Sequence, residues 1–129
     1  MKIILFTLGL VVLMTSCKKE PGEGGASSIY GKVQVYNINS FGDTLGEPFY
    51  GMDEDVYIIY GENDDTYDDK FATSFDGSFR FDYLTPGKYT LFSYSRCDVC
   101  NDELTVIKKT VEITSDKSEN PISDIIILK

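Results

Sequence analysis

The sequence contains no histidine and no tryptophan, and only three of its 129 residues are cysteine. Without histidine the chain cannot form a Ser-His-Asp triad or a Cys-His pair, and histidine-ligated metal centres are excluded. Paired carboxylates could in principle act as general acid and base, as in glycosidases. Such enzymes normally need a deep cleft, for which a sandwich of about 100 residues offers little room. The sequence therefore predicts a protein that is not an enzyme and that needs no cofactor.

The chain also lacks an apolar run of the about 20 residues that a membrane-spanning helix requires. A shorter apolar stretch, from Ile3 to Met14, follows the single early cation Lys2. This pattern predicts a cleaved export signal over residues 1–16. The residues LMTS before Cys17 resemble the lipobox of bacterial lipoproteins, and the resemblance implies that Cys17 carries a lipid. The alternative is an ordinary secretory signal, which would leave an odd free thiol in an oxidising compartment.

Basic residues are scarce, at 12 Lys and Arg against 21 Asp and Glu. Loss of Lys2 with the signal leaves 11 basic and 21 acidic residues, a formal charge of −10. Phosphate backbones would repel such a chain, so no nucleic-acid partner is expected. Residues 17–28 are rich in Gly, Ser and charge, which predicts a flexible tether. Their charged beginning resembles, incompletely, the segment that sends some lipoproteins to the outer face of the outer membrane, which makes an outer membrane lipoprotein, exposed at the surface, the expected location.

Over residues 29–129 the apolar residues recur with a period of two rather than 3.6, which predicts strands and no helix. Asp76-Gly77 is a strong hairpin signal, and the alternation after it places Phe79, Phe81 and Tyr83 on one face. In the sixth expected strand the apolar phase changes, so we expect a bulge near Lys108-Lys109. The expected strands are Ile29–Ile38, Val56–Tyr60, Lys70–Ser74, Ser78–Tyr83, Lys88–Arg96, Glu103–Thr114 and Ile122–Leu128. Seven short strands with turn signals between them predict one all-β domain, a seven-stranded sandwich of two sheets.

Four stretches, IYGKV, TSFDGSFRFDYLTPGKYTLFSYS, KKTVEIT and ISDIIIL, follow one another in an order that resembles the carboxypeptidase regulatory-like domains. These domains belong to the prealbumin-like and Cna-B-like sandwiches of bacterial envelope proteins. The resemblance implies a sandwich of the prealbumin-like or Ig-like kind, acting as a noncatalytic module that packs, spaces or binds beside other domains. Its most specific residues are Gly77, Phe79, Phe81, Leu84, Pro86, Gly87 and Tyr89.

The pair Cys97 and Cys100 resembles, taken alone, the redox motif of thioredoxin-like proteins. Here it follows a strand, with no helix to lower a thiol pKa and no βαβ pattern. A structural disulfide in the loop between the fifth and sixth strands is the prediction for an exported protein, and a small thiol oxidoreductase is the alternative. Zinc is disfavoured because two thiolates complete only half of a tetrahedral site.

Acidic residues cluster before and after the second expected strand. Calcium needs six to eight oxygen ligands, and two loops at one end of a sandwich could supply several. The spacing matches no EF-hand, and charge runs are usually solvated loops, so no metal site is predicted. The weak calcium candidates are Asp53, Asp55, Asp64, Asp65, Asp68 and Asp69.

The aromatic residues are interpreted first as core and sheet packing, since they alternate as buried strand residues do. The alternative is a binding face of exposed tyrosines, Tyr57, Tyr60, Tyr67 and Tyr94, suited to sugars or peptides. The sequence thus predicts a noncatalytic lipid-anchored envelope protein, an accessory or binding module that presents a sandwich to an envelope partner or extracellular ligand. The alternative function is a calcium-dependent or carbohydrate-binding accessory protein.

Overall fold

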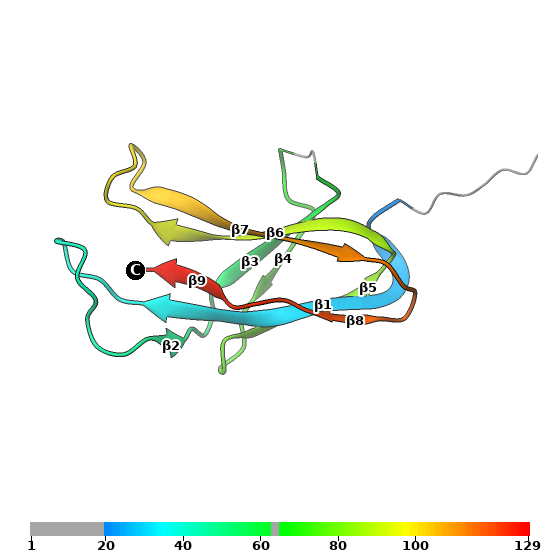
Figure 1. Ribbon diagram of the computed structural model, residues 1–129, viewed down its shortest axis with the longest axis horizontal. Helices are drawn as coiled ribbons and strands as arrows, with labels where there is room; N and C mark the ends of the chain where they lie inside the picture. The colour runs from blue at the N-terminus through cyan, green and yellow to red at the C-terminus, as the bar shows by residue number, and fades with distance from the viewer. Residues whose placement is uncertain (1–19, 63–64) are drawn as a thin grey trace, which may run out of the picture.

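The computed structural model describes residues 20–62 and 65–129, and this part of the chain contains strands and turns but no helix. Two sheets, of five and four strands, pack face to face (Figure 1). The expected all-β sandwich of two sheets is therefore confirmed. The described residues include no helix with the length and hydropathy of a membrane crossing. The strands are β1 (Glu23–Tyr36), β2 (Phe49–Tyr50), β3 (Asp55–Tyr60), β4 (Asp69–Ala72), β5 (Ser78–Leu84), β6 (Gly87–Arg96), β7 (Leu104–Ile113), β8 (Glu119–Pro121) and β9 (Ile125–Leu128).

The five-stranded sheet is built around β1, a strand of 14 residues. The first half of β1 pairs with β5, antiparallel, along one edge and with β8, parallel, along the other. Its second half pairs with β2, antiparallel, and with β9, parallel. Val33 and Val35 are buried while Lys32 and Gln34, which alternate with them, are partly exposed, so β1 turns one apolar face toward the other sheet.

The four-stranded sheet has the order β4-β3-β6-β7, and its strands are all antiparallel. Apolar side chains from its inner face meet those of the five-stranded sheet, and together they form one core. The core residues are Ile29, Val33, Val35, Val56, Ile58, Phe79, Phe81, Leu84, Tyr89, Leu91, Ile113, Ile125 and Ile127.

Each of the seven expected strands has a counterpart in the structure, which adds the short strands β2 and β8. β2 has two residues and β8 has three, so neither is long enough to show a period in the sequence. Both lie beside β1, and β8 is fastened to it by Asn120, whose Nδ2 donates to the carbonyl oxygen of Ser28 at 3.0 Å.

The expected tether over residues 17–28 is wrong in its second half, because residues 23–28 belong to β1. Their small residues serve close packing: a Cβ on Gly25 would lie 2.1 Å from the carbonyl oxygen of Leu84. Ser27 is buried, and its Oγ donates to the carbonyl oxygen of Ser115 at 3.0 Å. A composition typical of a linker here reflects the close packing of β1 against the end of β5.

The turn at Asp76-Gly77 is present, but it does not join two strands of one sheet. Gly77 has a φ of +77°, as the signal required. However, β4 pairs with β3 in one sheet and β5 with β1 in the other, so the turn carries the chain across the sandwich. The expected hairpin is therefore wrong in its pairing. Turn residues indicate that the chain reverses direction, but they do not indicate which sheet the next strand joins.

Two expectations about facing are also wrong. Phe79 and Phe81 are buried, but Tyr83 is 74% exposed, because its backbone adopts a φ of +59° beside an irregularity in the β1–β5 pairing. No bulge interrupts β7, which pairs with β6 in unbroken register. Leu104 and Val106 therefore stay on the outer face, opposite to Val111 and Ile113.

The described chain begins at a buried clamp beside the turn between β5 and β6. The Tyr89 hydroxyl accepts from the Gly22 backbone N–H at 2.9 Å and donates to the carbonyl oxygen of Thr85 at 2.6 Å. The Thr85 hydroxyl donates to the carbonyl oxygen of Glu20 at 2.8 Å, and the Thr85 N–H donates to the carbonyl oxygen of Gly22 at 2.9 Å. These bonds fix residues 20–22 at one end of the sandwich.

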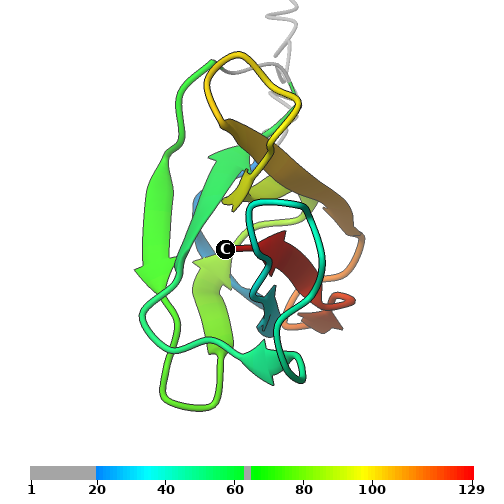
Figure 2. The same cartoon turned by 90° about the vertical axis from the view of Figure 1, so that its left-hand side faces the viewer.

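The loop 37–48, the turn 97–103 and the C-terminus gather at the opposite end (Figure 1). Figure 2 looks onto this end and shows the two loops beside the C-terminus. Residues 20–22 and the C-terminus thus lie at opposite ends of the sandwich.

Candidate binding face

Aromatic side chains gather on the outer face of the four-stranded sheet. Tyr57 of β3 is paired in register with Phe92 of β6, so the two side chains leave the sheet side by side. Tyr94 lies two residues further along β6, and Tyr67 comes from the segment between β3 and β4. We call these four residues, Tyr57, Tyr67, Phe92 and Tyr94, the aromatic face.

The rings contact one another closely. The centroids of Tyr57 and Phe92 are 4.9 Å apart with planes 13° apart, a stacked pair. Tyr67 and Tyr94 meet Tyr57 edge-on, with centroids at 4.7 and 5.6 Å. Phe92 is nearly covered, whereas Tyr67 and Tyr94 are each 51% exposed. The cluster therefore has a packed centre and two exposed flanks.

Charged side chains border the cluster at Tyr57. Partial burial, together with the neighbouring Asp55 carboxylate, raises the pKa of the Tyr57 hydroxyl, and the Lys70 ammonium opposes this shift. Lys70 and Asp55 form an exposed ion pair with Nζ and Oδ2 at 3.9 Å. Tyr57 thus remains a neutral phenol at physiological pH, able to donate and to accept a hydrogen bond.

The unbroken register of β7 extends the apolar surface. Val106 pairs with Tyr94, and Leu104 pairs with Arg96, on the same outer face. Leu104 is 54% exposed. Sequence reasoning missed these two residues because the bulge expected near Lys108-Lys109 would put them on the same face as Val111 and Ile113. Continuing the alternation of β7 without interruption would have placed them outside.

Three of the four tyrosines expected on a binding face, Tyr57, Tyr67 and Tyr94, are brought together, and Tyr60 is not. Tyr60 points to the inner side of β3, where its ring packs edge-on against Tyr89 at 5.9 Å. Residues of one strand an odd number of positions apart lie on opposite faces, so Tyr57 and Tyr60 could not share one.

The cysteine pair forms a disulfide, Cys97–Cys100, as predicted. It lies in the turn between β6 and β7, where the Cys97 N–H donates to the carbonyl oxygen of Glu103 at 2.8 Å. The described residues contain no helix whose N-terminus could activate either thiol. The disulfide therefore closes a loop that is already tied by backbone hydrogen bonds.

The acidic candidates do not converge within the described residues. Asp55 pairs with Lys70, and the Asp68 Oδ2 accepts from the Tyr60 N–H at 2.7 Å. Asp64 lies outside the described residues, as do Cys17 and the signal at 1–16. In the described ranges no three His, Cys, Asp or Glu side chains stand close enough to hold a metal ion. The remaining candidates, Asp53, Asp65 and Asp69, are all exposed.

No family model matches the chain, and no curated protein matches it. Among solved structures, the chain is similar to a crystal structure described as that of a "putative carbohydrate binding protein" from Pseudomonas aeruginosa. The two share 15% identity and a TM-score of 0.49, over 84% of this chain and 91% of the other. A likeness at this level transfers no residue role and no ligand to this chain.

Proposed function

We propose that the chain is a noncatalytic, lipid-anchored protein of the bacterial outer membrane whose sandwich is a binding module, with the aromatic face as its contact surface. The observation that carries the proposal is the exposure of Tyr67 and Tyr94 beside the stacked pair of Tyr57 and Phe92. The sequence of residues 1–16 and the position of Cys17 support the anchor. The absence of histidine from the sequence supports a role without catalysis.

A protein partner in the envelope fits this surface best. Tyr and Arg are enriched where protein interfaces derive most of their binding energy, and such residues cluster around a desolvated centre. Here the stacked pair is the centre, and Tyr67 and Tyr94 lie around it. Leu104 and Val106 extend the apolar area along β7, beyond what a single sugar unit would cover.

A glycan is the second candidate, favoured by the half-exposed rings of Tyr67 and Tyr94. Sugars stack on the faces of aromatic rings. The faces that Tyr57 and Phe92 turn toward each other are already stacked, so the two flanking rings offer most of the free area. This arrangement suits a short contact with a sugar less well than a broad contact with a protein.

Site-specific photocrosslinking in intact cells tests the proposal. A photoreactive phenylalanine analogue replaces Tyr94 in one strain and Tyr67 in another, and the crosslinked material is identified by mass spectrometry. Tyr83 is the matched control, because it is an exposed tyrosine on the other sheet. We expect the same protein to be captured from positions 94 and 67 and not from position 83.

Two results would contradict the proposal. Capture of one partner from all three positions would show contact without a preferred face, and no capture from positions 94 and 67 would remove the aromatic face as a protein-binding surface. In the second case, titration of the protein with glycans tests the remaining candidate. Mass spectrometry of the mature N-terminus tests the anchor separately, and an unmodified terminus other than Cys17 would refute it.

A further inference from the structure

A polar hollow of about 390 Å³ lies on the five-stranded sheet, away from the aromatic face. Its walls come from β1, β5, the turn before β8 and the first residue of β8. It is lined by Ser28, Arg80, Asp82, Tyr83, Lys117 and Glu119. None of these residues is used by the proposed function.

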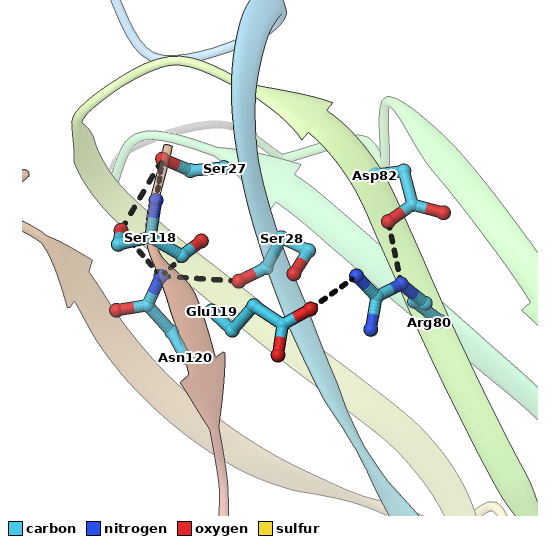
Figure 3. A network of polar contacts seen from close by, with 7 residues as sticks. All are labelled: Ser27, Ser28, Arg80, Asp82, Ser118, Glu119 and Asn120. Carbon is cyan, nitrogen blue, oxygen red and sulfur yellow. Dashed lines mark hydrogen bonds and ion pairs between the residues drawn. The ribbon is translucent and has the colours of Figure 1, made fainter. Parts of the chain in front are cut away.

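One lining residue of the hollow, Arg80, is paired with two carboxylates. The Arg80 Nε donates to the Asp82 Oδ1 at 2.6 Å, and its Nη2 donates to the Glu119 Oε1 at 3.0 Å (Figure 3). Its guanidinium carbon also lies 5.6 Å from the centre of the Tyr30 ring. Within the described chain the Arg80 Nη1 makes no hydrogen bond, so it remains available as a donor.

Beneath this ion pair lies a hydroxyl without a partner. Ser28 is only 4% exposed, and its Oγ is the one buried side-chain polar atom of the described residues that makes no hydrogen bond. Figure 3 shows the Ser28 side chain pointing toward the side where Glu119 meets Arg80. Buried hydroxyls are nearly always hydrogen-bonded, so an unpaired one at the base of a hollow indicates a missing partner.

The neighbouring serine makes the contrast clear. Ser27 is equally buried, but its Oγ donates to the carbonyl oxygen of Ser115 and accepts from the Ser118 N–H at 3.1 Å. The turn before β8 therefore supplies hydrogen-bond partners for the Ser27 hydroxyl, whereas the described residues supply none for the Ser28 hydroxyl.

We propose that the hollow binds a small neutral ligand with adjacent hydroxyl groups, such as one sugar unit. The charges of Arg80 and Lys117 balance those of Asp82 and Glu119, so neither a cation nor an anion is favoured. The hollow offers donors and acceptors together, and a hydroxyl group satisfies both. The exposed Tyr83 ring adds an apolar surface for the C–H face of a sugar.

The ligand would replace the Arg80–Glu119 contact over Ser28. Exposed ion pairs of this kind contribute little to stability, so they open readily. One ligand hydroxyl then pairs with the Ser28 Oγ, and others pair with the Arg80 Nη1 and with the carboxylates. The bonds that the opened ion pair loses are re-formed to the ligand.

Nuclear magnetic resonance of the full chain, in a zwitterionic detergent without a sugar headgroup, tests this inference. The protein is titrated from micromolar to tens of millimolar with glucose, galactose, mannose and N-acetylglucosamine. We expect at least one sugar to shift the signals of Ser28, of the Arg80 Nε–H and of Tyr83. We expect Ser28→Ala to weaken that binding about tenfold, the loss of one hydrogen bond.

Two readouts separate a binding role from a structural one. Ser28→Ala should leave the melting temperature without sugar unchanged or higher, because it removes an unpaired buried hydroxyl. Tyr83→Ala should also weaken binding, and its side chain is exposed, so folding is not at risk. Tyr94→Ala should have no effect on these shifts, which keeps this hollow distinct from the aromatic face. The inference is overturned if none of the four sugars shifts these signals, or if the shifts persist unchanged in Ser28→Ala.

Discussion

The buried clamp around Tyr89 gives a sharp prediction for Tyr89→Phe, which removes one oxygen atom and keeps the ring. The hydroxyl is bonded to the Gly22 N–H at 2.9 Å and to the Thr85 carbonyl oxygen at 2.6 Å, and Tyr89 is 1% exposed. Without it, a donor and an acceptor stay buried and unpaired. Leaving such groups unsatisfied costs about 1–3 kcal/mol.

The assay is thermal and urea unfolding of the variant beside the unmodified protein. A loss of about 2 kcal/mol lowers the melting temperature of a domain of this size by roughly 8–16 °C. The urea midpoint should fall as well, with an unchanged slope, because the surface exposed on unfolding is nearly the same.

Tyr60→Phe is the matched control. The Tyr60 ring contacts the Tyr89 ring, but its hydroxyl reaches only the exposed Glu23 Oε1 at 3.5 Å. Removing that oxygen should change stability by less than about 0.5 kcal/mol. If Tyr89→Phe is no more destabilising than Tyr60→Phe, the clamp does not contribute to the stability of the fold and the reasoning fails.

Four further outcomes are expected. Gly25→Ala should destabilise the protein by about 1–3 kcal/mol, because its Cβ would collide with the Leu84 carbonyl oxygen, and Gly25 has no positive φ that would add backbone strain. An unfolding midpoint equal to that of the unmodified protein would refute the clash. Replacing Cys97 and Cys100 by serine should lower the free energy of unfolding by about 2 kcal/mol, as for a very short closed loop. The native protein should show no insulin-reducing activity, and turnover in that assay would establish a thiol oxidoreductase. Burial raises the pKa of Tyr60 from 10.0 to about 12, so above pH 10 the unfolded chain loses this proton first and stability falls as the pH rises toward 12. The melting temperature of Tyr60→Phe should therefore fall less steeply with pH than that of the unmodified protein. Parallel plots of melting temperature against pH would refute the assignment. Calcium should leave the melting temperature unchanged, because no three carboxylates meet in the described ranges; an increase would revive the acidic loops as a site.

Alternation along the strands predicted the architecture well where both faces of a strand differ in polarity. Phe79 and Phe81 are buried on β5 as expected, and Val33 and Val35 are buried on β1. Where the outer face of a strand is also apolar, alternation no longer distinguishes the buried face from the exposed one. The change of apolar phase in β7 predicts a bulge for this reason, although the register of β7 never changes.

The aromatic face could be predicted only in part. The sequence indicates Tyr57, Tyr67 and Tyr94, but it also indicates Tyr60, which alternation places on the inner face, and it gives no signal for Phe92. Tyr83 could not have been placed, because its outward direction depends on a positive φ that arises from irregular pairing with β1. The polar hollow depends on β8, which is too short for any periodic signal.

Under the proposed lipid anchor, the clamp on residues 20–22 also limits how far the sandwich can stand from a membrane. If Cys17 carries the lipid, only residues 18 and 19 separate the anchor from the clamp, and the three residue steps from 17 to 20 span at most about 11 Å. The end with the β5–β6 turn would then lie close to the headgroups, and the loops at 37–48 and 97–103 would face away from the bilayer. A partner embedded in the same membrane would meet the sandwich at a high effective concentration, so even a weak contact on one face would be well occupied.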